Sequence, residues 1–256
     1  MTTVRDMGTV LCQHVTPLFY NNPAGIPVQF GCGFFIADGD NQYLVSAAHV
    51  FDEIGRGNQL FYPIGNGLNR NLSGQALLTP LNGKDRTSDR FDVGVLKLED
   101  PALPPYPATG KRSLPIAALI RNALPRQNKQ YMLVGFPETK SRANPVAREL
   151  NSQPYSYTNI STPASTYAAR AVSEKTHIAV LFRRGRSVAQ DGRIVPFPSP
   201  RGMSGSPLWL LYDQVGDNDS KQTPIVGVFI EYAKSHNSLI ATDAASVLEM
   251  ISAHQR

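Results

Sequence analysis

Short runs of apolar and β-branched residues recur along the whole chain, and residues that favour turns separate them. Runs of this kind are typical of β-strands. In the first half, the pattern predicts strands at residues 8–19, 28–36, 43–46, 60–64 and 93–98. In the second half, it predicts strands at residues 130–137, 155–160, 177–182 and 225–230. The pattern therefore indicates an all-β protein with two groups of short strands.

Glycines mark special positions within this pattern. Asp38-Gly39-Asp40 separates the second and third predicted strands, which is a strong signal for a hairpin. Gly31 and Gly33 lie inside a predicted strand, where they indicate a bend such as a barrel corner. They do not form a dinucleotide-binding fingerprint, because the third glycine is missing and no helix is predicted after them.

The segment 101–107 is rich in proline and is the natural boundary between the two groups of strands. We therefore predict an N-terminal unit at residues 1–107 and a C-terminal unit at residues 108–256. The chain ends on a predicted amphipathic helix with Asp243 as its N-cap. The buried side of this helix is expected to carry Val247, Leu248 and Ile251.

The composition adds few restrictions. The 256 residues are 41% hydrophobic, with 20 Gly and 20 Pro, which describes a globular, turn-rich protein. The N-terminus is not followed by an apolar signal core, and no stretch approaches the roughly 18 apolar residues of a membrane span. Cys12 and Cys32 are too few for a disulfide framework, although their pairing stays open. We expect a cytoplasmic protein without membrane contact.

The formal charge of +5 raises the question of nucleic-acid binding. Arg183, Arg184 and Arg186 form the densest basic patch, but no recognised nucleic-acid-binding motif accompanies them. A solvated loop is the simpler interpretation. Nucleic acid is therefore an unlikely partner, and contact with a polyanion is the alternative.

The segment Gly202-Met203-Ser204-Gly205-Ser206 places a hydroxyl between two glycines. A serine hydroxyl is a weak nucleophile, so Ser204 would need a base and a donor site for the developing oxyanion. Gly202 can adopt backbone angles that turn its own N–H and that of Ser204 toward one point. The alternatives are an ordinary surface turn and Ser206 as the nucleophile.

Two upstream residues supply the missing partners. His49 follows the third predicted strand, in a segment where a short helical turn is expected, and Asp92 lies at the start of the strand 93–98. A carboxylate beside a buried strand needs a partner, and the histidine ring would provide one. The alternatives are a structural histidine, an Asp92 that caps a turn or pairs with Arg90, and Asp89 in the role of Asp92.

The order of His49, Asp92 and Ser204, each beside a predicted strand, resembles that of the chymotrypsin-like (trypsin-like) serine peptidases, of which this chain looks like a bacterial-type stand-alone member. The resemblance implies two six-stranded antiparallel β-barrels with the site between them and a C-terminal helix on the second barrel. It also implies a role for each of these residues in peptide-bond hydrolysis. Ser204 would attack the scissile carbonyl, His49 would transfer the proton, Asp92 would orient His49, and the N–H groups of Gly202 and Ser204 would hold the oxyanion.

The chain departs from the secreted members of that family at three positions. Val50 stands where they have a cysteine, so the disulfide that braces the histidine loop is absent. Met203 replaces the aspartate that pairs with a newly cut N-terminus. Ser206 replaces the second glycine after the nucleophile, as in several bacterial and viral relatives. The second departure predicts a site that needs no N-terminal cleavage, being preformed or controlled by a partner.

The resemblance also locates the primary specificity pocket. It would be lined by residues about six positions before Ser204 and by the strand 229–232, so the candidates are Pro198, Ser199, Phe229, Ile230 and Glu231. Their character favours a small or apolar substrate side chain. An inward-pointing Glu231 would instead attract a basic side chain.

No metal or other cofactor is expected. Cys12, His14 and Cys32 lack the closely spaced pair of a zinc site. The remaining histidines, His177, His236 and His254, are interpreted as structural or surface residues.

Three functions follow from the sequence. The first is a serine endopeptidase that acts on protein or peptide substrates, with a regulatory protein partner as an option. The second is a catalytically silent, peptidase-like module that binds a peptide or a protein. The third is a basic nucleic-acid-binding protein. The intact set of His49, Asp92, Ser204 and Gly202 favours the first.

Overall fold

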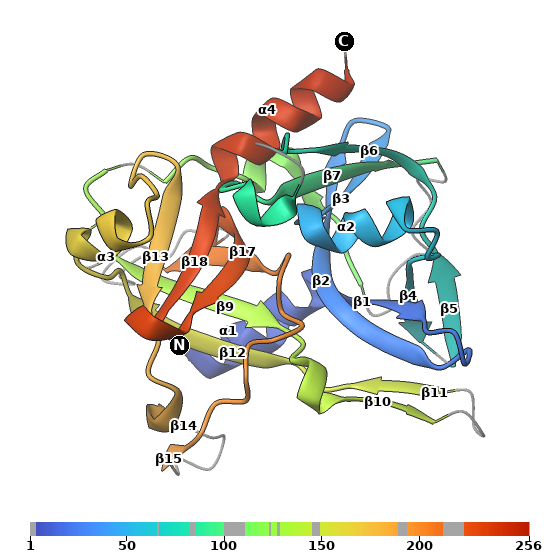
Figure 1. The fold of residues 1–256 in the computed structure, drawn as a ribbon, viewed down its shortest axis with the longest axis horizontal. Helices are drawn as coiled ribbons and strands as arrows, with labels where there is room; N and C mark the ends of the chain where they lie inside the picture. Colours follow the sequence, from blue (N-terminus) through green and yellow to red (C-terminus); the bar gives the residue numbers. More distant parts are fainter. Residues whose placement is uncertain are drawn as a thin grey trace.

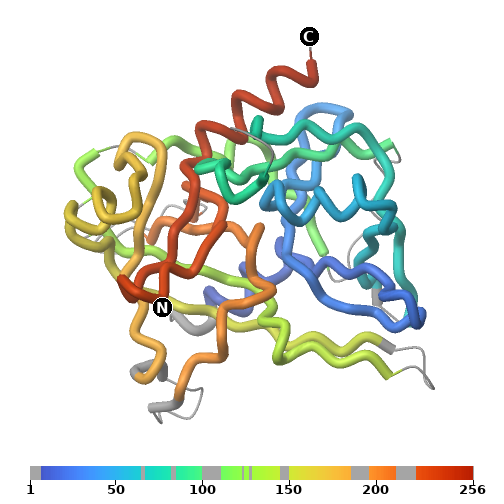
Figure 2. The backbone as a smooth tube through the Cα atoms, in the orientation of Figure 1, coloured from blue at the N-terminus to red at the C-terminus, as the bar shows by residue number. Residues whose placement is uncertain are grey.

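The computed structural model describes residues 4–65, 67–81, 85–99, 111–122, 124–126, 129–144, 149–188, 194–211 and 223–255. Within them, two curled antiparallel sheets lie side by side (Figures 1 and 2). No described helix is both long and apolar enough to cross a membrane. The proposed boundary segment 101–107 lies outside the described residues.

The first sheet comes from the N-terminal half of the chain. Its strand order is β5-β4-β1-β2-β3-β7-β6, and the short β8 pairs in parallel with β2. The sheet has eight described strands, against six implied by the resemblance. Its strands are β1 (Val15–Asn21), β2 (Pro27–Asp38), β3 (Asn41–Ala47), β4 (Phe61–Gly65), β5 (Leu68–Asn71), β6 (Gly74–Leu78), β7 (Val93–Leu98) and β8 (Leu114–Pro115).

The second sheet has six described strands in the order β12-β9-β16-β17-β18-β13. A bridge between Ser161 and Val180 joins its two ends, so this sheet closes on itself. Its strands are β9 (Gln130–Gly135), β12 (Tyr155–Ile160), β13 (His177–Leu181), β16 (Pro207–Leu211), β17 (Ile225–Ala233) and β18 (Ser238–Asp243). Two hairpins extend away from the sheets (Figure 1): β10 (Ser141–Asn144) with β11 (Glu149–Ser152), and β14 (Ser187–Val188) with β15 (Ile194–Val195).

Helices complete the structure. α1 (Val4–Leu11) packs beside β9, α2 (Ala48–Gly55) follows β3, and α3 (Ala164–Ala169) precedes β13. α4 (Ala244–His254) contacts both β7 and β17, so it packs against both sheets and not only against the second. The short 3₁₀ turns are η1 (Cys12–His14), η2 (Arg86–Ser88), η3 (Ile116–Ala118), η4 (Glu138–Lys140), η5 (Arg184–Arg186) and η6 (Lys234–His236).

The hydrophobic core has three parts. One cluster lies within the first sheet and contains Leu18 and Phe35, and another lies within the second sheet and contains Phe182. The third joins the sheets, since it contains Phe34 of β2 together with Trp209 of β16. Neighbouring residues of β2 thus enter different clusters, because successive side chains of a strand point to opposite faces. The shared cluster fixes how the two sheets sit against each other.

The strand pattern predicts the sheets well and fails at the N-terminus. Residues 8–11 belong to α1, and β1 begins only at Val15, so the strand predicted at residues 8–19 is wrong in its first half. Met7 and Leu11, four residues apart, both pack on the shared core cluster. Gly8 lies close to Ser156 of β12, where a Cβ atom would not fit. Burial of one helix face therefore overrides the β-propensity of the segment.

The C-terminal helix agrees with its prediction. The carboxylate of Asp243 accepts a hydrogen bond from the N–H of Ala245 at 3.0 Å, as an N-cap does. Val247 and Ile251 are fully buried, and Leu248 is partly buried against the same cluster.

Lys111 is partly buried beside β1. Its ammonium group lies 2.5 Å from the carbonyl oxygen of Val15 and 4.8 Å from the centre of the Phe136 ring. Burial lowers the pKa of Lys111 to about 8. Below that pH the folded protein holds a charge that the unfolded chain solvates better, so this residue favours folding more as the pH rises.

We therefore expect Lys111→Met to change how stability depends on pH. Between pH 8 and the ordinary lysine range, the free energy of unfolding of the wild type should rise relative to that of the variant, by at most about 1.4 kcal/mol per pH unit. Urea denaturation of both proteins at several pH values measures this difference. The exposed Lys175→Met is the matched control. A wild-type-minus-variant difference that stays constant over this range would refute the expectation.

Candidate active site

Asp92 is bound to the first turn of helix α2, the helix that carries His49. One carboxylate oxygen of Asp92 lies 2.6 Å from Nδ1 of His49, and the other accepts the backbone N–H of His49 at 2.9 Å. The carbonyl of Asp92 accepts the N–H of Ala48 at 2.9 Å. Ala47, the N-cap residue, has no capping side chain, so Asp92 caps this helix from another segment.

The backbone of Asp92 is in the left-handed region, with φ 46°. Few residue types tolerate this conformation, and aspartate is one of them. The conformation turns the side chain back toward α2 at the point where β7 begins. Both carboxylate oxygens of Asp92 are bound to His49, and none of the described ion pairs links Asp92 to Arg90.

Asp89 faces a different partner. Its side chain is 2% exposed, and its carboxylate accepts hydrogen bonds from Arg86, from the hydroxyl of Thr79 and from the N–H of Phe91. It does not contact His49 in the described structure. Of the two aspartates that the sequence leaves open, Asp92 is the one beside the imidazole.

The loop that carries Ser204 packs against the first sheet. The carbonyl of Ser204 accepts the N–H of Cys32 at 2.7 Å. Gly205 has φ 89°, and a Cβ atom on it would lie 2.9 Å from the nitrogen of Ala47, two residues before His49. The glycine therefore allows the serine loop to approach the histidine segment closely.

The hydroxyl of Ser204 is half-buried and donates to the carbonyl of Ile230 at 3.4 Å. The described structure has no hydrogen bond between this hydroxyl and the His49 ring. Catalytic hydrogen bonds are often loose without substrate and tighten when it binds. Ser206 is fully buried and faces Gly135, so this rival has no access to a substrate.

The turn before Ser204 is held by Glu138. The N–H of Glu138 donates to the carbonyl of Arg201 at 2.9 Å. In a trans peptide, the N–H and the C=O point in opposite directions. The N–H of Gly202 is therefore directed away from Glu138. Gly202 has φ 80°, and a Cβ atom on it would lie 2.7 Å from Cβ of Glu138.

The carbonyl of Gly202 is also held in place. It accepts hydrogen bonds from Nε2 of Gln29 at 2.9 Å and from the thiol of Cys32 at 3.2 Å. Met203 is fully buried in the core cluster of the second sheet. The conformation of the turn thus depends on packing and on neutral hydrogen bonds. No carboxylate is present at residue 203 to pair with an N-terminus.

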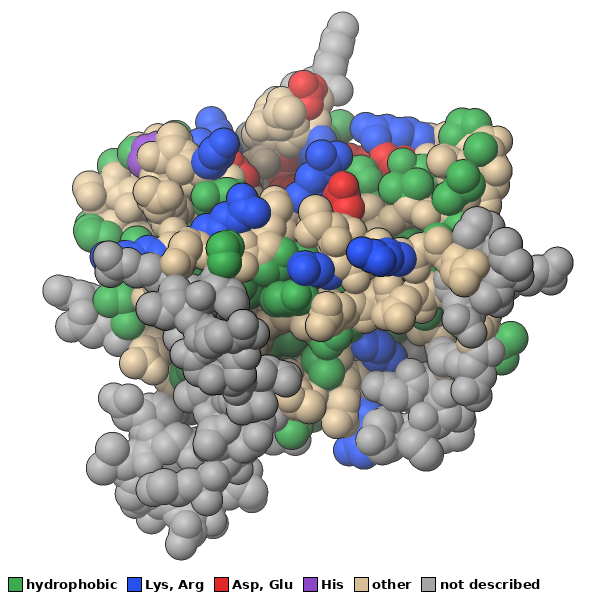
Figure 3. Space-filling model, turned by 90° about the horizontal axis from the view of Figure 1, so that it is seen from below, with side chains coloured by type: hydrophobic (Ala, Val, Ile, Leu, Met, Phe, Trp, Pro, Cys, Tyr) green, Lys and Arg blue, Asp and Glu red, His purple; other side chains and the backbone are tan. Residues whose placement is uncertain are grey.

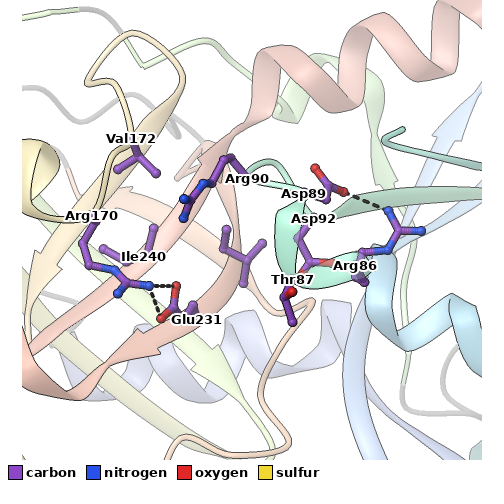
Figure 4. Close-up of a pocket in the computed structure, with 10 residues that line it drawn as sticks. Arg86, Thr87, Asp89, Arg90, Asp92, Arg170, Val172, Glu231 and Ile240 are labelled. Atoms are coloured by element: carbon purple, nitrogen blue, oxygen red, sulfur yellow. Dashed lines mark hydrogen bonds and ion pairs between the residues drawn. The ribbon is translucent and has the colours of Figure 1, made fainter. Parts of the chain in front are cut away.

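The expected specificity residues separate into two groups. Phe229 lies in the core, Pro198 is buried and Ser199 is half-buried. Ile230 and Glu231 instead line a pocket of about 320 Å³ next to Asp92 (Figure 4). Residues 86–92 of the first half and 170–240 of the second contribute to it, namely Arg86, Thr87, Asp89, Arg90, Asp92, Arg170, Val172, Ile230, Glu231 and Ile240.

Glu231 is paired inside this pocket. Both oxygens of its carboxylate accept hydrogen bonds from the guanidinium of Arg170, as Figure 4 shows. Its charge is therefore already compensated, which weakens the alternative in which Glu231 attracts a basic substrate side chain.

Tyr232 is a residue that the sequence-based list omits. Its ring packs edge-on against Phe182, with the centres 4.9 Å apart. Phe182 in turn contacts Phe197, the residue before Pro198, and Tyr157. Aromatic rings therefore pack together where the resemblance expects the primary pocket. The sequence does offer a signal for Tyr232, because this residue follows Glu231 directly in the strand 229–232.

His177 ties the Asp92 loop to the second sheet. Its Nε2 lies 2.8 Å from the carbonyl of Arg90, and the hydroxyl of Thr242 donates to the carbonyl of Phe91 at 2.5 Å. Burial lowers the pKa of His177, which favours the neutral ring in the core. The structural interpretation of this histidine fits these contacts, although the loop that it holds leads directly to Asp92.

The described residues contain no group of three or more candidate metal ligands. Both cysteines are free thiols: the thiol of Cys12 donates to the carbonyl of Thr9, and that of Cys32 to the carbonyl of Gly202. Nδ1 of His14 contacts the carbonyl of Arg112 at 3.0 Å. These three residues thus have separate partners.

One described arginine of the densest basic patch is engaged with its own loop. Arg183 and Arg184 are exposed, and Nε of Arg184 donates to the carbonyl of Phe197. On the face shown in Figure 3, Lys and Arg side chains lie in separate groups among other residues. Among the side chains that Figure 3 colours by type, the basic ones do not form a continuous stripe of the kind that nucleic-acid binding favours.

Neither a protein-family model nor a curated protein matches the sequence. Solved structures do match. One is neuropsin, a serine protease expressed in the limbic system of mouse brain, with a TM-score of 0.58 and 12% identity, covering 95% of this chain and 95% of that chain. The likeness shows the fold. The chain has the chymotrypsin-like two-barrel fold with a C-terminal helix.

The Gly202 turn gives a direct test of the site. Gly202→Ala should reduce the reactivity of Ser204 toward a fluorophosphonate by about 100-fold or more, because the new Cβ meets Glu138 and displaces one N–H of the turn. Gly55→Ala is the matched control, since a Cβ there meets nothing within 4 Å. The rate of covalent modification, measured by mass spectrometry, checks this. Equal rates in both variants would show that the turn has no such role.

Proposed function

We propose that this protein is a serine endopeptidase that hydrolyses peptide bonds of protein substrates through Ser204, His49 and Asp92. The observation that carries the proposal is the carboxylate of Asp92, bound to both the ring and the backbone of His49. The packing of the Ser204 loop against the same segment supports it. The fold agrees with a hydrolase of the trypsin type.

In this proposal, Ser204 Oγ attacks the scissile carbonyl while Nε2 of His49 takes the hydroxyl proton. Asp92 keeps the other ring proton on Nδ1, so that Nε2 is free to act as the base. The N–H groups of Gly202 and Ser204 would stabilise the negative charge on the attacked oxygen. His49 then gives this proton to the leaving amine, which leaves an acyl group on Ser204. Water, with His49 again as the base, releases that acyl group.

The substrate backbone has a suitable strand edge on which to bind. β16 pairs with β17 only as far as Val228, whereas β17 continues through Ala233. Glu231 and Tyr232 pair with β18, and the carbonyl of Ile230, which lies at the register shift of that pairing, faces the hydroxyl of Ser204. A peptide in extended conformation would add a strand here.

The site is proposed to be formed without proteolytic activation. Glu138, Gln29 and Cys32 already hold the peptides on both sides of Gly202. Met203 supports the turn from the core and leaves no acidic group for a new N-terminus.

Fluorophosphonate labelling tests the function directly. The wild type should be modified at Ser204, while Ser204→Ala should show no labelling and His49→Ala should lose several orders of magnitude in rate. Mass spectrometry of the labelled peptide identifies the site. A chain without residues 1–3 should label at the wild-type rate, because no cleavage is required.

The outcomes separate the functions. No modification of the folded wild type would rule out an active peptidase and favour the silent, peptide-binding module, for which the Ser204–Ile230 hydrogen bond is the supporting contact. Faster labelling after removal of residues 1–3 would show that activation by trimming exists.

Cleavage preference gives a second test. We expect cleavage after small or apolar side chains, because Tyr232 and its aromatic neighbours narrow the expected primary pocket. Tyr232→Gly should broaden the preference for the substrate side chain before the cleaved bond toward large apolar residues. The neighbouring Glu231→Gln should leave this preference unchanged. A peptide library with product sequencing measures both. Cleavage restricted to Lys and Arg in the wild type would contradict this expectation.

A further inference from the structure

One arginine links the two segments that carry His49 and Asp92. Nε and Nη2 of Arg86 donate to the two oxygens of Asp52 at 2.9 and 2.8 Å. Nη1 donates to the carboxylate of Asp89 at 2.9 Å. Asp52 lies on α2, three residues after His49, and Asp89 lies three residues before Asp92. The guanidinium therefore spans the helix and the loop.

The contacts of Arg86 form a mostly buried hydrogen-bond network, which distinguishes them from a surface ion pair. The side chain of Arg86 is 13% exposed, that of Asp52 is 24% exposed and that of Asp89 is 2% exposed. Nη1 of Arg86 also donates to the carbonyl of Thr79 at 2.7 Å. Hydrogen bonds to Asp52 raise the pKa of Arg86 above its usual range. A planar guanidinium that binds one carboxylate with two parallel N–H groups also fixes its orientation.

The short turn η2 that carries Arg86 is itself anchored. The carboxylate of Asp85 accepts the N–H of Thr87 at 2.7 Å, and the carbonyl of Asp85 accepts the N–H of Ser88. Thr79, which follows β6, binds Asp89 through its hydroxyl and Val93 through its backbone. Arg86 is thus held by the sheet while its side chain reaches α2.

The geometry at Asp92 needs such a support. The carboxylate can contact the ring and the backbone of His49 together only if α2 and the loop keep one relative position. Asp92 achieves this with φ 46°, a sparsely populated conformation that persists because the surrounding contacts hold it. His177 and Thr242 fix the loop to the second sheet through its backbone carbonyls at Arg90 and Phe91. Arg86 provides the link to the helix.

We propose that Arg86 is a positioning residue, which holds α2 against the Asp92 loop so that Asp92 orients His49. This inference rests on the proposed peptidase function for its effect on rate. Arg86 acts through Asp52 and Asp89 and does not contact the reacting atoms. Without it, the position of α2 against the loop would depend on the contacts of Asp92 and on the apolar packing of Val50 and Phe51.

The test compares four variants with the full-length wild type. Arg86→Gln removes the bridge, and Arg86→Lys keeps the charge but loses the two parallel hydrogen bonds. Asp52→Asn weakens only the end on α2 and leaves Asp89 paired. Arg56→Gln is the matched control, because Arg56 pairs with Glu53 within α2 and does not reach the loop. Circular dichroism and thermal melting show which variants fold.

Two readouts distinguish positioning from general damage. The first is the rate at which a small alkyl fluorophosphonate modifies Ser204. Such a probe has no peptide part to fill the pocket that Arg86 lines, so lost substrate contacts do not affect it. The second is the far-downfield proton resonance expected for the Nδ1–H of His49 when it donates to Asp92 in a 2.6 Å hydrogen bond.

We expect labelling to slow by about 10- to 100-fold in folded Arg86→Gln, and by less in Arg86→Lys and Asp52→Asn. The downfield resonance should broaden or disappear in the same order, and Arg56→Gln should match the wild type. If folded Arg86→Gln and Asp52→Asn keep both the rate and the resonance, the proposal is wrong.

If Arg86→Gln does not fold, Asp52→Asn decides the question by the same two readouts. The failure of the peptidase function would look different. The wild type itself would then not be labelled, while the resonance would still report whether Arg86 positions His49. A wild type with neither labelling nor resonance would contradict both proposals.

Discussion

The carboxylate of Asp92 is the contact on which the site depends, because it caps helix α2 and binds the ring of the histidine in that helix's first turn. A helix N-terminus favours a nearby negative charge, so the same field that attracts the carboxylate helps to hold it beside the ring. The Asp92 carboxylate thus stabilises the helix and holds the histidine ring at the same time. Any change that moves the helix away from the loop separates the carboxylate from the ring as well.

Three connections maintain this contact from different directions. The shared core cluster fixes the two sheets against each other, with Phe34 from one side and Trp209 from the other. His177 and Thr242 attach the Asp92 loop to the second sheet, and Arg86 attaches it to α2. The position of the Asp92 loop therefore depends on contacts with both halves of the molecule. This explains why residues far apart in the sequence are needed to place one carboxylate.

The sequence predicts the strands and the candidate residues because both depend on local patterns. β2 is recognisable from its apolar run, and Ser204 from the glycines that flank it. The helix at residues 4–11 was missed because its formation depends on packing of Met7 and Leu11 against strands that are distant in sequence. Local propensity does not contain that information.

The support of the site was less predictable than the site itself. The sequence presents Asp89 only as an alternative to Asp92. It does not predict the ion pair of Asp89 with Arg86, because that pair depends on the three-dimensional arrangement. Tyr232 was in the expected strand, yet its direction depends on the register shift between Phe229 and Glu231 in the pairing of β17 with β18. A one-residue shift changes the face to which a side chain points, and no sequence pattern marks it here.

The hydroxyl of Ser204 has one proton, and the proposed mechanism requires that proton to change its acceptor. In the structure it donates to the carbonyl of Ile230, at a distance of 3.4 Å that makes a weak hydrogen bond. In the proposed mechanism, the same proton must pass to His49. A substrate backbone N–H that binds the edge of β17 would compete for that carbonyl and leave the imidazole as the remaining acceptor. In this proposal, the reactivity of Ser204 would report the balance between these two acceptors, and the contacts of Asp92 and Arg86 would favour His49 by holding its ring in place.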